Sequence, residues 1–197
     1  VQYTTLRCTD CHQDQGQWGF PHQPIDAETR RDLTISMQNV CQECHADIFE
    51  RNADGVHAQH IVDGNLEAAT CADCHGNHAI HDPDDPRERV SQTCGNCHSE
   101  INEQYSASVH GAALLGEDNP DVPVCTDCHG VHNIPDPTTA AFRLSSPQMC
   151  GRCHADVDLM NKYNISTDVF ETYVADFHGT TVTLFDPQSP EEETNKA

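Results

Sequence analysis

The sequence predicts a mostly irregular chain with several α-helices and little or no β structure. Three observations support this fold class. A five-residue phrase, Cys-x-x-Cys-His, occurs six times and uses all 12 cysteines. Only 36% of the residues are hydrophobic and the mean hydropathy is -0.64, which leaves little apolar side-chain surface for a protein core. Apolar residues recur at spacings of three and four only in short runs, and this pattern predicts short helices.

Each Cys-x-x-Cys-His phrase is an attachment sequence for c-type haem. Two thiols three positions apart can reach the two vinyl groups on one edge of the macrocycle, and the next imidazole then lies under the iron. The sequence therefore predicts six haem c groups. The predicted covalent attachment residues are Cys8, Cys11, Cys41, Cys44, Cys71, Cys74, Cys94, Cys97, Cys125, Cys128, Cys150 and Cys153. The predicted proximal iron ligands are His12, His45, His75, His98, His129 and His154.

Zinc sites and disulfide scaffolds are the ordinary alternatives for paired cysteines. A zinc site takes four nitrogen or sulfur ligands, which gives no reason for a histidine directly after every second cysteine. With 14 histidines in 197 residues, chance would place one after all six pairs roughly once in ten million cases. Haem is therefore the favoured interpretation. The six macrocycles are expected to form a stacked chain that serves as the core, with the polypeptide wrapped around it.

Charge and hydropathy limit the partners. The formal net charge of -22, from 32 acidic and 10 basic residues, excludes nucleic acid as a natural partner because phosphates would be repelled. The acidic surface favours solubility, and the alternative is that it steers the chain towards a basic redox partner. No stretch approaches the roughly 20 apolar residues of a membrane span, so we expect no transmembrane segment.

Internal repetition predicts three two-haem modules, at residues 1–56, 57–109 and 110–180, followed by an extended acidic tail at 181–197. Cys71 and Cys125 lie 54 residues apart, and Cys94 and Cys150 lie 56 apart. The longer phrase Cys-x-Asp-Cys-His-Gly-x-His-x-Ile occurs at 71–80 and again at 125–134. The first module is a looser copy with an insertion after His12.

Helices are predicted to follow the second haem phrase of each module. After His98, the residues Ile101, Tyr105, Val109 and Ala112 fall on one helix face. The pattern after His45 is weaker and is interrupted at Gly55. In the third module, proline-free sequence continues to residue 161, and a further helix is expected to start near residues 166–168.

Eight histidines lie outside the phrases, and the repeat sorts six of them into two classes. The first class follows the first phrase of each module, and its members are His22, His78 and His132. The second class lies beyond the second phrase, and its members are His57, His110 and His178. Two classes of three supply one distal ligand for each iron. His60 and His81 have no counterparts and are expected at the surface or beside a ligand. Met37, Met149 and Met160 are expected to be packing residues.

Helix geometry restricts the second class. A continuous helix rises about 1.5 Å per residue, so the 12 residues from His98 to His110 would span roughly 18 Å. Such a histidine must then ligate some other haem, which we expect in an adjacent module. If the second class serves the following module, His178 has no module ahead of it and the first module lacks a donor. Both gaps close if His178 ligates a haem of a neighbouring copy in a head-to-tail homopolymer. If the class serves the preceding module, the chain is self-sufficient, and the sequence leaves both alternatives open.

Over residues 8–179 the paired phrases and the His-Gly positions at His110 and His178 resemble the multihaem c-type cytochromes, in particular the cytochrome c3-like group. The resemblance implies periplasmic carriers, subunits of respiratory complexes, or extracellular filaments used in anaerobic respiration. It also implies haem attachment outside the cytoplasmic membrane. The chain begins at Val1 without the pattern of a signal peptide. We therefore expect a mature form in the periplasm or outside the cell.

The choice between carrier and enzyme depends on the axial positions. An iron that reduces a small molecule needs an open position, and related reductases often mark it with lysine in place of the phrase histidine. All six phrases here end in histidine. The sequence thus predicts electron hopping along six bis-histidine haems, with no catalytic residue. The protein would be a periplasmic carrier or a filament subunit, with redox proteins or an extracellular acceptor as partners. The alternatives are a subunit or fragment of a larger respiratory complex, and a reductase of nitrogen or sulfur oxyanions.

Overall fold

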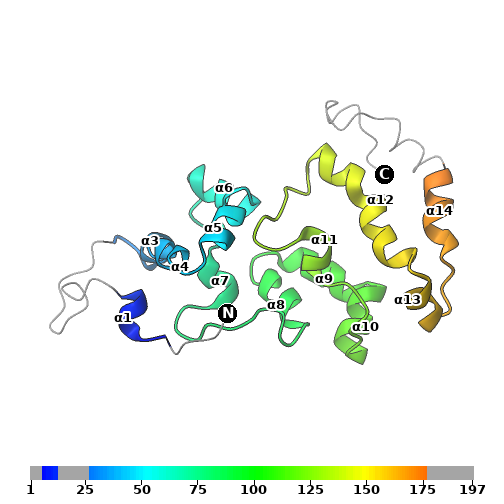
Figure 1. The fold of residues 1–197 in the computed structure, drawn as a ribbon, viewed down its shortest axis with the longest axis horizontal. Helices are drawn as coiled ribbons and strands as arrows, with labels where there is room; N and C mark the ends of the chain where they lie inside the picture. The colour runs from blue at the N-terminus through cyan, green and yellow to red at the C-terminus, as the bar shows by residue number, and fades with distance from the viewer. Residues whose placement is uncertain (1–5, 13–26, 177–197) are drawn as a thin grey trace. The chain divides into compact units, whose positions relative to one another are not determined.

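The computed structural model describes residues 6–12 and 27–176 of the 197-residue chain. Within these ranges the regular elements are α-helices joined by irregular segments, and there is no strand (Figure 1). This confirms the predicted fold class. None of the described helices has both the length and the apolar character required to cross a membrane. His22, His178 and the tail at 181–197 lie outside the described residues.

The chain divides into two compact units. The first unit comprises Val1–Pro86 together with His132–Ile134, and the second comprises Arg87–Val131 together with Pro135–Ala197. The three two-haem modules are defined by sequence repetition rather than by compactness, and they stay a prediction.

The first unit is built from short helices around α4. Its described helices are α1 (Cys8–Cys11), α3 (Arg30–Ser36), α4 (Gln38–Gln42), α5 (Ala46–Ala53), α6 (Val56–Val62) and α7 (Cys71–His75). Helix α4 packs against α3, α5 and α7, and α5 packs against α6. Residues 132–134 join this unit at the start of α6, where the Val56 N–H donates to the Ile134 carbonyl at 2.8 Å.

The second unit holds the clearest apolar core. Its described helices are α8 (Arg89–Gly95), α9 (Ser99–Ala107), α10 (Val109–Glu117), α11 (Cys125–His129), α12 (Ala140–His154), α13 (Val157–Lys162) and α14 (Asp168–Ala175). Val90, Leu114 and Val124 are buried together, and Tyr105 and Val122 pack at their edge. This cluster is small, as expected from the low hydrophobic fraction of the sequence.

The helix expected after His98 is interrupted. Helix α9 ends at Ala107 and α10 begins at Val109, because Ser108 is extended (φ -75°, ψ 164°) and caps α10. The Ser108 hydroxyl accepts from the Gly111 N–H at 3.1 Å and donates to the Tyr105 carbonyl at 2.6 Å. The prediction of one continuous face through Val109 was therefore wrong, and the span of a straight helix does not apply to His110. Helices α13 and α14 confirm the two helical segments expected in the third module.

Candidate haem sites

The first phrase of each module forms a single helical turn, α1, α7 or α11. The aspartate inside the phrase starts the turn, because its carboxylate accepts the N–H of the residue before the first cysteine. These hydrogen bonds are 2.8 Å for Asp10, 2.7 Å for Asp73 and 2.6 Å for Asp127. The repeat contains this aspartate, but its capping role was not predicted. The turn fixes the two cysteines and the histidine relative to one another.

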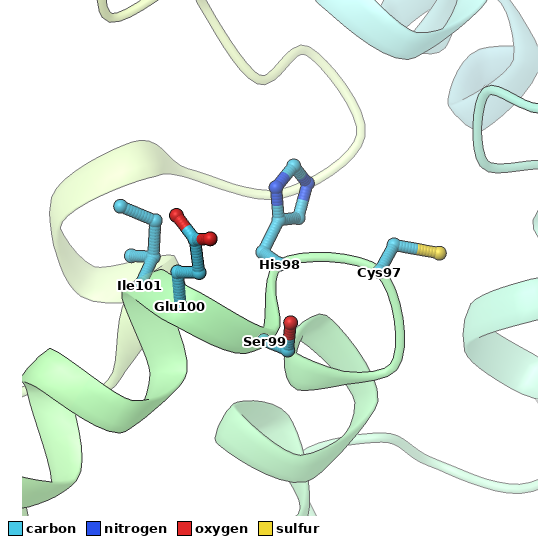
Figure 2. A pocket seen from close by; sticks show the side chains of 5 residues that line it. All are labelled: Cys97, His98, Ser99, Glu100 and Ile101. Carbon is cyan, nitrogen blue, oxygen red and sulfur yellow. The ribbon is translucent and has the colours of Figure 1, made fainter.

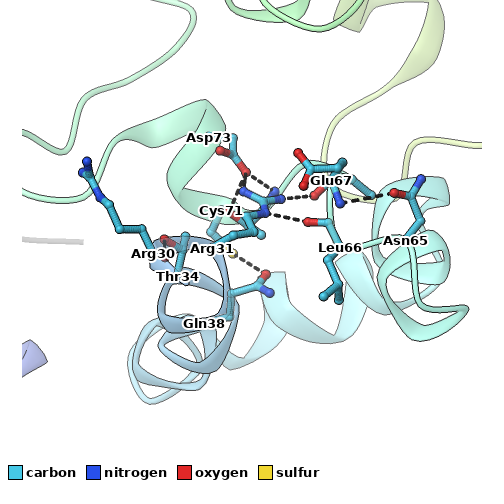
Figure 3. A network of polar contacts seen from close by, with 11 residues as sticks. Arg30, Arg31, Thr34, Gln38, Asn65, Leu66, Glu67, Cys71 and Asp73 are labelled. Atoms are coloured by element: carbon cyan, nitrogen blue, oxygen red, sulfur yellow. Dashed lines mark hydrogen bonds and ion pairs between the residues drawn. The ribbon is translucent and has the colours of Figure 1, made fainter. Parts of the chain in front are cut away.

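Two of these turns are also held by an arginine from the preceding module. Arg31 on α3 forms an ion pair with Asp73 at 2.8 Å and donates to the carbonyls of Leu66, at 2.6 Å, and Ala68 (Figure 3). Arg87 forms the matching ion pair with Asp127 at 2.5 Å. Sequence reasoning missed both contacts because 42 and 40 residues separate the partners. The sequence feature that could have indicated these contacts is an arginine 7 to 10 residues before the second Cys-x-x-Cys-His phrase of a module.

The second Cys-x-x-Cys-His phrase of each module lies at a junction between two helices or within a helix. Cys97 and His98 lie on the loop that leads into α9, next to an open pocket of about 310 Å³ that Glu100 and Ile101 also line (Figure 2). Ile101 is 62% exposed, so it offers apolar surface directly beside the phrase. In the third module, α12 carries Cys150, Cys153 and His154 on one helix. These positions combine thiols, an imidazole and accessible apolar surface, as a macrocycle requires.

In three pairs of histidines, the two ring centroids are separated by nearly the same distance. The ring centroids of His12 and His78 are 6.2 Å apart with an interplanar angle of 18°. Those of His75 and His132 are 6.1 Å apart at 12°, and those of His110 and His154 are 6.1 Å apart at 49°. Each pair joins a phrase histidine to a candidate distal histidine. In residues 6–12 and 27–176 no group of three or more His, Cys, Asp or Glu side chains is arranged to hold a metal ion.

The pairs have the dimensions of two imidazoles on opposite sides of an iron. Metal–nitrogen bonds of about 2 Å, and about 1 Å more from each ligating nitrogen to its ring centre, separate the centroids by about 6 Å. Two aromatic rings in direct contact, with no metal between them, have centroid separations in a similar range. The pairing of phrase histidines with candidate distal histidines favours ligation, because ordinary ring contacts would not follow the repeat.

Hydrogen bonding around the rings also fits metal ligation. His75 Nδ1 lies 3.2 Å from the carbonyl of His81. A ligating histidine usually donates its second N–H in this way, which leaves Nε2 for the metal. Nδ1 of His132 and Nδ1 of His154 are buried without a hydrogen-bond partner in the described part of the chain. Among these three rings, only His75 therefore has the hydrogen bond that usually accompanies ligation through Nε2.

Burial favours the neutral form of two candidate distal histidines, His110 and His132, and the neutral imidazole is the form that binds metal. Burial, and then the neighbouring His154, lower the pKa of His110. Burial, and then the nearby His75, lower the pKa of His132. Both effects disfavour the charged ring, so the lone pair of the ligating nitrogen is available at neutral pH.

Cysteines of consecutive phrases lie near one another within each unit. Burial, followed by the nearby Cys41 thiol, raises the pKa of Cys71. A hydrogen bond from Cys94 lowers the pKa of Cys125 to about 7. Burial and then Cys150 raise the pKa of Cys128. Consecutive attachment sites are therefore adjacent within each unit.

Other histidines are placed differently. The ring of His129 lies parallel to that of Phe142, with centroids 5.2 Å apart and an angle of 4°. His60 and His81 are both exposed. The His81 carbonyl faces His75 Nδ1, while its own Nδ1 lies 3.2 Å from the Ala79 carbonyl.

A family model described as cytochrome c3 matches residues 65–155. This stretch contains four of the six phrases together with His78, His110 and His132. The match supports a multihaem c-type cytochrome that binds c-type haem and transfers electrons. Proteins of this family are mainly electron carriers and are typically periplasmic or extracellular. Searches of curated proteins and of solved structures find no match.

Proposed function

We propose that the chain binds six c-type haems, one at each Cys-x-x-Cys-His phrase, and conducts electrons between them without catalysing a reaction of its own. When bound, the haems supply one-electron chemistry through the ferric and ferrous states of iron. The observation that carries the proposal is the separation of 6.1–6.2 Å in three histidine pairs. Each pair supplies two imidazoles to one iron.

The protein's own residues make these sites suitable for conduction. An imidazole on each side fills both axial positions and excludes a small-molecule substrate, which argues against a reductase. Two histidine ligands also favour a low reduction potential, since the thioether of methionine raises it. The adjacent cysteines of consecutive phrases hold neighbouring attachment sites close together, which short electron-transfer steps require.

The setting proposed is the periplasm or the cell exterior. There the chain would serve as a soluble carrier or as a subunit of a conducting filament, with redox proteins or an extracellular acceptor as partners. The net charge of -22 would attract a basic partner at low ionic strength and repel nucleic acid. A role as a subunit of a larger respiratory complex is the alternative, and it would use the same haem sites.

The central test combines a haem count with single substitutions in the holoprotein. Mass spectrometry and the pyridine haemochrome spectrum should give six haems per chain. His78→Ala, His132→Ala and His110→Ala should each add about one high-spin haem, relative to wild type, in electron paramagnetic resonance of the oxidised protein. His60→Ala is the matched control and should add none. A lower haem count, or three variants indistinguishable from wild type, would refute the proposal.

Two further measurements separate the finer roles. Negative-stain electron microscopy of the native protein distinguishes uniform filaments from discrete particles, and so a filament subunit from a carrier. Assays with nitrite, hydroxylamine and tetrathionate should give no turnover. Sustained reduction of any of these would identify a reductase instead.

A further inference from the structure

An arginine compensates the charge of the aspartate in the 71–75 turn. Asp73 stands between Cys71 and Cys74, the two predicted attachment cysteines, so its carboxylate belongs to the turn that would hold the macrocycle. The Arg31 guanidinium is 2.8 Å from this carboxylate and also donates to the Ala68 carbonyl, three residues before Cys71 (Figure 3). The Arg31 side chain is only 22% exposed, which limits the screening of its charge by water.

The 125–129 turn of the second unit repeats this arrangement. Asp127 holds the same place between the two cysteines, and the Arg87 guanidinium lies 2.5 Å from its carboxylate. Arg87 also donates at 3.2 Å to the Val122 carbonyl, which again lies three residues before the first cysteine. A further guanidinium, that of Arg152, donates to the backbone carbonyl of Asp127 at 2.8 Å. The compensated aspartate therefore recurs in both units of the chain.

Each arginine comes from the segment that leads into the second phrase of the preceding module. Arg31 lies on α3, which packs against α4, and α4 contains Cys41 and packs against α7. Arg87 lies two residues before α8, which contains Cys94 and packs against α11. The net charge at one attachment turn thus depends on the docking of the segment that carries the preceding attachment site.

Charge beside a haem acts on its reduction potential. Adding an electron to the iron is favoured by nearby positive charge and opposed by nearby negative charge, so an uncompensated carboxylate in the attachment turn lowers the potential. A guanidinium paired with that carboxylate cancels most of this effect. Ion pairs as exposed as these contribute little to folding stability, so the effect on potential is the larger consequence of the contact.

We propose that Arg31 and Arg87 are positioning residues for electron transfer. By compensating Asp73 and Asp127, they hold the reduction potentials of the haems at 71–75 and 125–129 above the values that the aspartates alone would impose. This inference rests on the proposed function, because it requires a haem at each of the two turns. It assigns the tuning of each of these haems to a side chain of the preceding module.

The test compares four holoproteins at pH 7 by spectroelectrochemical titration: wild type, Arg31→Gln, Asp73→Asn and the double variant. Arg31→Gln leaves the carboxylate uncompensated, so one component of the titration should shift to lower potential. Asp73→Asn keeps an oxygen that can accept the Thr70 N–H but leaves the guanidinium unpaired, so one component should shift to higher potential. The double variant removes both charges and should return close to wild type.

Two further variants separate charge from structure. Arg30→Gln is the matched control, because Arg30 is the exposed neighbour of Arg31 in α3 and its side chain points away from Asp73 (Figure 3). It should leave every component in place. Arg31→Lys keeps the charge without the planar two-point contact, so it should shift the component less than Arg31→Gln does. Shifts in the same direction in Arg31→Gln and Asp73→Asn, equal shifts in Arg31→Lys and Arg31→Gln, or no shift at all would overturn the proposal.

Replacing both Cys71 and Cys74 with serine locates the effect. This variant should lose one haem, and in its background Arg31→Gln should no longer shift any component. A shift that persisted there would belong to another haem and would contradict the proposal. Arg87→Gln and Asp127→Asn repeat the test at the second turn and should give the same two signs. Failure of the proposed function is recognised separately, by fewer than six haems in wild type.

Discussion

His75 and His132 are 57 residues apart in the sequence, yet their ring centroids lie 6.1 Å apart. His132 has a left-handed backbone (φ 64°), a conformation that costs a non-glycine residue roughly 1 kcal/mol or more. The segment is held there because the Ile134 carbonyl accepts from the Val56 N–H. Strain retained at this position is consistent with a requirement on where the His132 ring lies.

Gly55→Ala should disturb this pair from a distance. A Cβ at Gly55 would lie 2.5 Å from the His132 carbonyl, so residues 132–134 must shift. We expect a loss of about 1–3 kcal/mol in the free energy of unfolding and partial high-spin character at the haem of His75. Denaturant titration and electron paramagnetic resonance measure the two effects.

Gly64→Ala is the control for Gly55→Ala. Gly64 also lies in the first unit and has a φ of 91°, but a Cβ there meets nothing within 4 Å. Gly64→Ala should therefore lower the free energy of unfolding by about 1 kcal/mol through backbone strain alone and keep the wild-type spectrum. If Gly55→Ala also kept that spectrum, the contact with His132 would not position the ring.

The ion pair of Arg31 and Asp73 should make stability depend on pH. Burial alone would raise the pKa of Asp73, but hydrogen bonds from Arg31 and Thr70 outweigh it, so the pKa lies below the usual 3.8. The unfolded chain therefore binds the proton more tightly than the folded chain. The stabilisation is present above about pH 4 and is lost as the pH falls through the folded pKa.

Asp73→Asn tests this dependence. Because the carboxylate is partly exposed and screened, we expect the free energy of unfolding of the variant to be about 0.5–1 kcal/mol lower than that of wild type at pH 7. The difference from wild type should disappear below the folded pKa. Urea titrations between pH 7 and pH 2.5 measure it, with the exposed Asp54→Asn as control. A difference that stays constant down to pH 2.5 would show that the carboxylate charge is not responsible.

The sequence predicted local features well because their causes are local. The helical fold class was predicted in this way, while haem attachment at the six phrases stays a prediction. Tyr105 stands five residues before His110, and its hydroxyl donates to the Pro123 carbonyl at 2.8 Å, just before the Cys125 turn. A missed local signal was Ser108, a favoured helix-capping residue before the apolar start of α10.

The sequence could not predict which candidate distal histidine lies opposite which phrase histidine, because this pairing depends on contacts between distant segments. The repeat sorted the histidines into two classes, but it allowed the second class to serve either the preceding or the following module. The pair of His110 and His154 corresponds to the following module. The contact of Arg31 with Asp73 is another case, since chain folding across 42 residues brings the two together.

Gly111→Ala should separate α9 from α10. A Cβ at Gly111 would lie 2.0 Å from the Tyr105 carbonyl, and the residue directly follows His110. We expect a loss of about 2–3 kcal/mol in unfolding free energy and a disturbed haem at His154. Gly116→Ala, in the same helix, meets nothing within 4 Å and should gain about 0.5–1 kcal/mol through helix propensity. Equal stabilities of the two variants would contradict the close contact with Tyr105.

His110→Met should raise the reduction potential of one haem. If His110 and His154 ligate one iron, the exchange replaces an imidazole with a thioether, which stabilises ferrous iron more strongly. We expect one component of a spectroelectrochemical titration to rise by on the order of 100 mV, with the others nearly unchanged. The control is Met160→Leu, because Met160 is buried, at 5% exposure, as a packing residue. It should change stability by less than about 1.5 kcal/mol and leave every potential in place. A His110→Met titration that overlays wild type would remove His110 from the ligand set.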